Sequence, residues 1–155
     1  METYFLQTLT AGIGSVGFAV LFNIHGRHLA LSGIGGAMSW ISYVIFMTLT
    51  GSPILALFGG TVVVELIAEI SARILKRPVI TLMVPMLIPL IPGGDLYRSM
   101  SHLVSGDMTA FADMSSFALK EAVAIAFGIL VVTLCVQIIT KTLRYLCLLK
   151  PPKNR

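Results

Sequence analysis

The chain is 155 residues long; 56% of its residues are hydrophobic and 12% are charged, and its mean hydropathy is +0.92. Soluble domains carry about 25% charged residues, so this composition indicates an integral membrane protein and excludes a soluble catalytic domain beside the spans. The net charge of +4 comes from residues beside hydrophobic segments and not from an aromatic-rich basic patch, so nucleic-acid binding is not predicted.

Hydropathy and turn signals predict an all-α, polytopic bundle with about five transmembrane spans. The expected spans cover residues of about 5–22, 29–50, 53–75, 79–106 and 115–139, within one transmembrane domain of residues 1–145 that a basic cytoplasmic tail of residues 146–155 follows. The first span lacks basic residues before it and a small-residue cleavage site after it, so we expect a retained helix and not a signal peptide. Gly51-Ser52-Pro53 predicts a tight turn, since proline suits the first turn of a helix.

Small residues recur four positions apart in the first three spans, a spacing that lets helix backbones approach closely. The pairs are Ala11 and Ser15, Ser32 and Gly36, Gly33 and Ala37, and Ala56 and Gly60. We expect these pairs to pack helices within the bundle, with a homo-oligomer face as the alternative.

The fourth segment is apolar over Val79–Ile91, yet three prolines interrupt it and two glycines follow. These residues are Pro85, Pro89, Pro92, Gly93 and Gly94. The apolar run is shorter than the ~20 residues that an intact span needs. Broken helices at membrane depth usually line a cavity. The segment is therefore predicted to consist of two half-helices joined at Pro92-Gly93-Gly94.

Basic residues test the number of crossings. With five crossings, Arg27, the cluster Arg73/Lys76/Arg77 and the basic tail all lie on one side of the membrane. Positive residues favour the cytoplasmic side, so we expect the N-terminus outside and the C-terminus in the cytoplasm. Five crossings require residues 79–106 to cross the membrane. The segment can do so only as two half-helices joined at the break, so the charge distribution also predicts the break.

Glu65 lies close to the middle of the third span, where an ionised carboxylate costs about 2.5–3.5 kcal/mol on insertion scales. Such a residue predicts a protonatable group that faces a cavity and couples proton movement to substrate movement. Glu69 and Arg73 follow at successive helical turns on the same face. Glu69 is therefore either a second proton-coupling residue or the partner of Arg73 in an i, i+4 ion pair.

Residues after the break predict a site for a carboxylate. Asp95 can be the N-cap of the second half-helix, whose N-terminus offers unpaired N–H groups and the positive end of the dipole. Gly93 and Gly94 let a ligand approach the backbone, Arg98 can add a bidentate contact, and Tyr97 can donate a hydroxyl. The alternative is that Asp95 pairs with Arg98 and the glycines only turn the chain.

Other polar residues carry weaker signals. Asn23 either caps the first helix or contacts substrate, and Lys120, next to Glu121, is explained by snorkelling toward the headgroups. His25 and His28 are spaced for a shared metal but lack a third nearby ligand, so no metal site is predicted. Since no Ser/His/Asp, Walker-type or zinc-protease pattern occurs, we expect neither an enzyme nor a cofactor.

The segments Gly17-Phe-Ala-Val-Leu-Phe-Asn23 and Val84-Pro-Met-Leu-Ile-Pro-Leu-Ile-Pro-Gly-Gly-Asp-Leu-Tyr97 resemble the threonine/serine exporter family (ThrE-type). The chain is most similar to the small stand-alone, YjjB-like membrane subunit of bacterial succinate export. The family motif falls here on Asn23, Pro89, Pro92, Gly93 and Tyr97. One departure is His25-Gly26, where members often have a proline.

This resemblance implies efflux of a small carboxylate-bearing metabolite across the bacterial cytoplasmic membrane. It also implies a larger membrane partner that carries the other half of the transporter. Together with Glu65, it predicts a proton-coupled exporter of a succinate-like dicarboxylate. Threonine or serine is the alternative substrate, and a membrane scaffold or assembly subunit without transport is the alternative function.

Overall fold

The computed structural model describes the backbone of residues 2–149 and the side chains of residues 3–142. Within this part of the chain the regular structure is entirely helical, which confirms the predicted all-α bundle. The elements are α1 (Glu2–Leu21), α2 (Arg27–Thr50), α3 (Pro53–Leu75), α4 (Val79–Leu87), the 3-10 helix η1 (Ile88–Leu90), α5 (Gly93–Val104) and α6 (Met108–Leu149).

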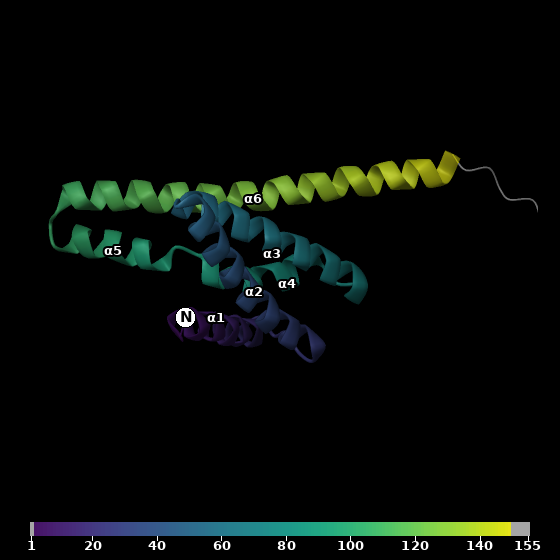
Figure 1. Cartoon of the computed structure of the whole chain (residues 1–155), viewed down its shortest axis with the longest axis horizontal. Coiled ribbons are helices and arrows are strands. Elements are labelled where there is room, and N and C mark those ends of the chain that lie inside the picture. The colour runs from purple at the N-terminus through teal and green to yellow at the C-terminus, as the bar shows by residue number, and fades with distance from the viewer. Residues whose placement is uncertain (1, 150–155) are drawn as a thin grey trace, which may run out of the picture.

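The first three helices form an antiparallel series. Helix α1 packs against α2, and α2 packs against α3, as Figure 1 shows. Gly51 ends α2 in the left-handed conformation, with φ 65°, and Pro53 begins α3. Thus the predicted turn at Gly51-Ser52-Pro53 is where the chain reverses.

Helix α6 runs parallel to α3. Contacts advance along both helices together: Phe58 lies beside Phe127, Glu65 beside Thr133 and Arg73 beside Thr140. The intervening α4, η1 and α5 therefore return the chain to the end of the bundle where α3 begins. A long seam between α3 and α6 results.

Small residues bring the helices close, as their spacing predicts. A side chain on Gly36 would meet Ser15 of α1, and one on Gly33 would meet Val16. Likewise, a Cβ on Gly59 would lie 2.6 Å from the ring of Phe46 on α2. These residues pack helices of the same chain against one another, which supports the interpretation of the pairs as bundle contacts.

The helix break is a consequence of proline chemistry. Pro85 is buried inside α4 without ending it, whereas Ile91, directly before Pro92, is extended with ψ 127°. A residue that precedes proline is driven away from the helical region, so the helix stops here. The two parts, Val79–Leu90 and Gly93–Val104, are bent by 58°.

The position of the break differs slightly from the predicted one. Gly93 and Gly94 are the first residues of α5 rather than part of the joint, and the joint is Ile91-Pro92. Accordingly, Asp95 is not the N-cap: Pro92 occupies that position, and Asp95 lies in the first turn. Steric restriction before Pro92 decides the location, and glycine tolerates the helical conformation that follows.

Helices α5 and α6 form a hairpin that extends beyond the other helices (Figure 1, left). The turn at Gly106 has φ 82°, and the Asp107 carboxylate accepts a hydrogen bond from the N–H of Ala110 at 3.0 Å. Asp107 thus caps α6, which begins at Met108, well before the start of about 115 expected for the last span. Polar residues near Asp113 delay the hydropathy signal but not the helix.

Among the described residues, four helices are long and apolar enough to cross a membrane, and the bent pair brings the number to five if it is one span. The four cover Thr3–Leu21, Arg27–Thr50, Pro53–Leu75 and Met108–Thr142. Helix α6 has 42 residues, or about 63 Å at 1.5 Å per residue. Of the predicted tail, residues 150–155 lie outside the described residues.

Candidate functional site

Polar side chains line the contact between α3 and α6 at successive helical turns, and we call this the polar seam. On α3 they are Thr61, Glu65, Glu69 and Arg73; on α6 they are Thr133, Gln137, Thr140 and Lys141. Their spacing places each set on one helix face. The α3 set was visible in the sequence, whereas the α6 set was missed. Five crossings make the third and fifth spans parallel, but the sequence does not show that α6 packs against α3.

Glu65 is the most deeply buried acid of the polar seam. Its side chain is 3% exposed, and the Thr133 hydroxyl donates a hydrogen bond to its Oε1 at 3.2 Å. Its Oε2 is buried and has no hydrogen-bond partner among the described residues. A carboxyl group with one unsatisfied oxygen in a helix interface can hold a proton there, since the charged form is costly to bury.

Close packing narrows the seam on one side of Glu65. A Cβ on Gly128 would lie 3.0 Å from the Thr61 side chain, and the Thr61 hydroxyl is buried without a partner among the described residues. The helices are therefore in direct contact at this level. In this conformation Glu65 lies in a packed interface and not in a wide channel.

On the other side, the seam opens into a small polar groove of about 260 Å³. Arg73 Nε lies 3.4 Å from Glu69 Oε2, and Arg73 Nη2 donates a hydrogen bond to Thr140 Oγ1 at 3.0 Å. Gln137 and Lys141 complete the polar lining. The ion pair supports the interpretation of Glu69 as the partner of Arg73.

At the break, Asp95 and Arg98 are already paired. Arg98 Nη1 lies 3.5 Å from Asp95 Oδ1, and the Arg98 side chain is 66% exposed. Tyr97 is also exposed. No side chain caps the start of α5, and a Cβ on Gly93 or Gly94 would meet nothing within 4 Å. The break is therefore open, and Arg98 must leave Asp95 to bind another carboxylate.

Asn23 is distant from the break. It lies in the turn between α1 and α2, is exposed, and has φ 60°. This turn lies at the end of the bundle where α3 finishes. The break lies nearer the start of α3, because Leu90, two residues before Pro92, packs beside Gly60. The structure does not bring Asn23 together with Arg98, and the left-handed conformation of Asn23 ends α1.

Glu121 is a buried acid that the sequence interpretation did not select. It is 5% exposed, and its Oε2 has no hydrogen-bond partner among the described residues. In the sequence, Glu121 was noted only as the neighbour of Lys120, which snorkelling explains.

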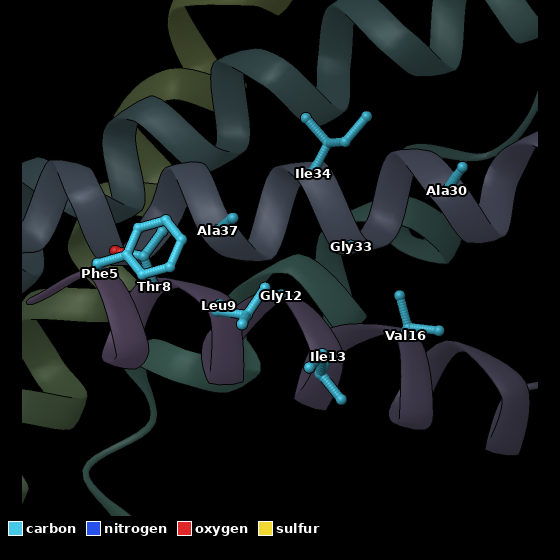
Figure 2. A pocket seen from close by; sticks show the side chains of 10 residues that line it. All are labelled: Phe5, Thr8, Leu9, Gly12, Ile13, Val16, Ala30, Gly33, Ile34 and Ala37. Atoms are coloured by element: carbon cyan, nitrogen blue, oxygen red, sulfur yellow. The ribbon is translucent and has the colours of Figure 1, made fainter. Parts of the chain in front are cut away.

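Two larger grooves are apolar and do not suit a charged metabolite. One, of about 470 Å³ between α1 and α2, has Thr8 as the one polar residue among its ten lining residues (Figure 2). The other, of about 590 Å³, lies between Ile54, Phe58 and Phe127. Such surfaces fit lipid chains or neighbouring transmembrane helices.

The histidines give no metal site. His25 Nδ1 lies 2.9 Å from the backbone oxygen of Asn23. Within the described part of the chain, no three His, Cys, Asp or Glu side chains gather closely enough to hold a metal ion.

A helical bundle with four or five potential spans, one of them broken, and two acids buried between its helices defines a multi-pass membrane protein. The family model described as threonine/serine exporter, ThrE, matches residues 7–135. The chain therefore belongs to the threonine/serine exporter family, as the sequence resemblance predicted.

An uncharacterized protein of Haemophilus influenzae (strain ATCC 51907 / DSM 11121 / KW20 / Rd) is 29% identical over 130 residues. The match covers 78% of this chain and 43% of that relative, so the chain spans less than half of the relative's length. No solved structure matches the chain.

Proposed function

We propose that the chain is one membrane subunit of a secondary transporter that exports small carboxylates and couples export to protons through Glu65. Family membership supports transport. The observation that carries the coupling is the burial of Glu65 with one unsatisfied oxygen between α3 and α6. When Glu65 binds or releases a proton, the charge of the polar seam changes. The free energy of separating α3 from α6 would therefore change in each transport cycle.

The polar groove at Glu69 and Arg73 is the proposed entrance. Arg73 and Lys141 supply two cations for a dicarboxylate such as succinate. Threonine or serine is the alternative substrate, because Glu69 would then receive the ammonium group while Arg73 receives the carboxylate. The same geometry serves both classes, so a direct comparison of substrates is needed.

At the break we propose a second contact for the substrate carboxylate. The first turn of α5 has no side-chain cap, so the backbone N–H groups after Gly93 and Gly94 and the helix dipole favour an anion. Arg98 would exchange Asp95 for the substrate, and Tyr97 would donate its hydroxyl. Asn23 would act only at the opposite end of the bundle.

A larger membrane subunit of the same family is the proposed partner. Alternating access moves one repeat or bundle against another, for which five spans are few. The relative in H. influenzae is more than twice as long as the segment it shares with this chain. We infer that the partner subunit corresponds to the part of this relative that lies outside the shared segment.

We propose that the protein lies in the bacterial cytoplasmic membrane with its N-terminus outside. Arg27, Arg73, Lys76 and Arg77 belong to turns or helix ends at one end of the bundle. Positive residues favour the cytoplasmic side, so the polar groove near Arg73 would open to the cytoplasm. That direction suits the entrance of an exporter.

The experiment that tests the function is efflux from cells or vesicles that contain the chain with and without its co-encoded larger subunit. Labelled succinate and threonine are compared over a range of pH. Glu65→Gln should abolish the pH dependence of efflux, because the amide cannot exchange a proton. An unchanged pH profile in Glu65→Gln contradicts the coupling role.

Glu69→Gln is the matched control. It lies one turn away on the same helix but pairs with Arg73, so we expect the pH dependence to persist. Arg98→Ala tests the second contact, with Arg77→Ala as a control of equal charge change. Unimpaired substrate affinity in Arg98→Ala excludes Arg98 as the carboxylate anchor.

A membrane scaffold is the second candidate function. The observation that favours it is the packed state of the seam, because Glu65 lies in a helix interface and not beside a wide cavity. A scaffold predicts that Glu65→Gln leaves efflux unchanged while removal of the whole chain abolishes assembly of the larger subunit. Subunit abundance measured beside efflux separates the two functions.

A further inference from the structure

Helix α1 presents two different strips to the outside of the bundle. It packs against α2, α4 and η1 and lies at the edge of the bundle (Figure 1). One strip is bulky, apolar and exposed, and consists of Leu9, Ile13 and Val20. The neighbouring strip, which we call the α1 polar strip, is small and polar and consists of Gln7, Thr10, Gly14 and Gly17. Lipid suits the bulky strip, whereas small and polar residues are typical of contacts between transmembrane helices.

A pocket of about 370 Å³ lies between the α1 polar strip and the broken segment. It is lined by Gln7, Thr10, Ala11 and Gly14 of α1, Trp40 of α2, and Ile88 and Pro89 of η1. Its α1 and α2 residues lie within two candidate spans, so the pocket is at membrane depth. Pro89 lacks an N–H, and the helix stops at Ile91. Irregular backbone occurs at this depth only where protein covers it or where it lines a water-filled cavity.

Trp40 supplies this pocket with a hydrogen-bond donor that lacks an acceptor. Its Nε1 is buried and has no hydrogen-bond partner among the described residues. The indole ring lies against Tyr43, with the ring centroids 5.2 Å apart. A buried N–H without an acceptor is costly, and tryptophan usually finds a partner for it. The pocket therefore suits a group that carries an oxygen acceptor, which a lipid acyl chain does not have.

We propose that a transmembrane helix of the larger subunit docks on the α1 polar strip and places a side-chain oxygen at the indole N–H of Trp40. A Cβ on Gly14 or Gly17 would meet nothing within 4 Å, so another helix backbone can approach closely there. The exposed amide of Gln7 can form a second hydrogen bond. The docked helix covers the pocket beside Pro89 and thus contacts the broken segment. This inference rests on the partner subunit of the proposed function.

The length of the relative favours the larger subunit over a second copy of this chain as the occupant. The shared segment makes up 43% of the H. influenzae protein, so that polypeptide contains more than an equal length of additional chain. A surface that the shared segment leaves uncovered can be covered there by the additional part. In a two-subunit transporter the larger subunit would take that place.

Cross-linking from single cysteines tests which strip faces the partner. In a background of Cys135→Ser and Cys147→Ser, a photoactivatable maleimide is attached to Gly14→Cys or to Ile13→Cys in membranes that contain the co-encoded larger subunit. We expect adducts with that subunit, identified by mass spectrometry, from Gly14→Cys and their loss from Ile13→Cys, the control on the bulky strip. Adducts mainly from Ile13→Cys, or adducts between two copies of this chain from Gly14→Cys, overturn the proposal.

The indole N–H can be observed directly, because Trp40 is the one tryptophan of the chain. Labelling with ¹⁵N-tryptophan gives a single indole signal in NMR spectra. Binding of the unlabelled larger subunit should move the proton resonance downfield, as formation of a hydrogen bond does. Gly14→Leu should prevent this shift by filling the strip, and Ile13→Leu should retain it. An unchanged resonance in the assembled complex overturns the proposed hydrogen bond and the docking mode with it.

Co-purification separates this inference from the proposed function. Trp40→Phe, which lacks the N–H, should weaken binding of the larger subunit by about three- to twentyfold, the range for hydrogen bonds between transmembrane helices. Thermal unfolding of each variant alone shows whether it folds. If the unsubstituted chain does not bind the larger subunit, the proposed partner and this interface are both wrong. If it binds, and folded Gly14→Leu and Trp40→Phe bind equally well, only the interface is wrong and the export function stands.

Discussion

Gly35 and Gly36 of α2 lie against neighbouring helices, whereas the two glycines that begin α5 have open space around them. A side chain on Gly35 would meet Met86 of α4, and one on Gly36 would meet Ser15 of α1. At Gly93 and Gly94 nothing lies within 4 Å. The same residue type therefore allows close packing in one region and leaves the backbone accessible in the other.

The buried residues differ in the same way. A continuous apolar cluster joins α3 and α4, and it includes Val64, Ala68, Leu82, Met86 and Leu90. The hairpin of α5 and α6 instead buries the polar residues Ser99 and Glu121, and Ser99 contacts the half-buried Ser115. Apolar packing favours one rigid arrangement. Polar contacts between helices change when a proton or ligand binds, so they let a helix respond to both. We therefore expect the α1–α4 bundle to stay rigid and the hairpin of α5 and α6 to move.

Gly36→Ala should have the largest effect on stability. The added methyl group would meet Ser15 and would lie 3.3 Å from the backbone oxygen of Ala11, so α1 must move away. Overpacking of this kind costs about 1–3 kcal/mol. Thermal unfolding in detergent measures the loss, and Gly17→Ala, where nothing lies within 4 Å, is the control. Equal stability of the two variants contradicts the tight α1–α2 contact.

Ser99→Ala should destabilise the hairpin and leave the bundle intact. It removes the hydrogen bond to Ser115, and such bonds between membrane helices contribute about 0.6–2 kcal/mol. Hydrogen exchange resolved by segment should show that the substitution accelerates exchange in α5 more than in α2 or α3. Ser101→Ala, on the exposed side of α5, is the control. Faster exchange throughout the chain contradicts independent hairpin motion.

Gly94→Ala should stabilise α5 by about 0.5 kcal/mol, because alanine loses less backbone entropy in a helix and meets no atom here. The same substitution should weaken substrate binding if the open backbone of the break receives a carboxylate. Thermal unfolding and substrate affinity are measured on the same preparation. Loss of stability would show that the space beside Gly94 is filled in the membrane.

Arg98→Gln should have the smallest effect on stability, below about 0.5 kcal/mol, because exposed ion pairs contribute little. Arg98 is 66% exposed and contacts Asp95 at 3.5 Å. Thermal unfolding at low and high salt checks this value. A loss as large as that in Gly36→Ala would mean that Arg98 holds the hairpin, and the bundle and hairpin would then not differ as described.

Local patterns predicted the elements well where one residue decides the conformation. Gly51 and Pro53 predict the second turn, and Pro92 predicts a break in the fourth segment. The prediction failed where hydropathy and helix formation diverge. Around Asp113 and Ser115 the chain becomes polar, yet Asp107 supplies the cap and α6 begins at Met108.

The sites were harder to predict because they depend on which helices meet. Glu65 was conspicuous alone in an apolar span, but Thr133 became its partner only through the parallel contact of α3 and α6. Glu121 was overlooked because the sequence shows only its neighbour Lys120 and not the helix packing that buries it.

The parallel arrangement of α3 and α6 has a consequence for experiments with reporters. Helices α1 and α3 point in the same direction as α6, so Glu2 and Leu149 lie at opposite ends of the bundle. An odd number of membrane passes separates the two positions if the bent pair is one crossing. Reporter domains fused at the two positions should then face different compartments, and a partner that joins both would have to cross the membrane itself.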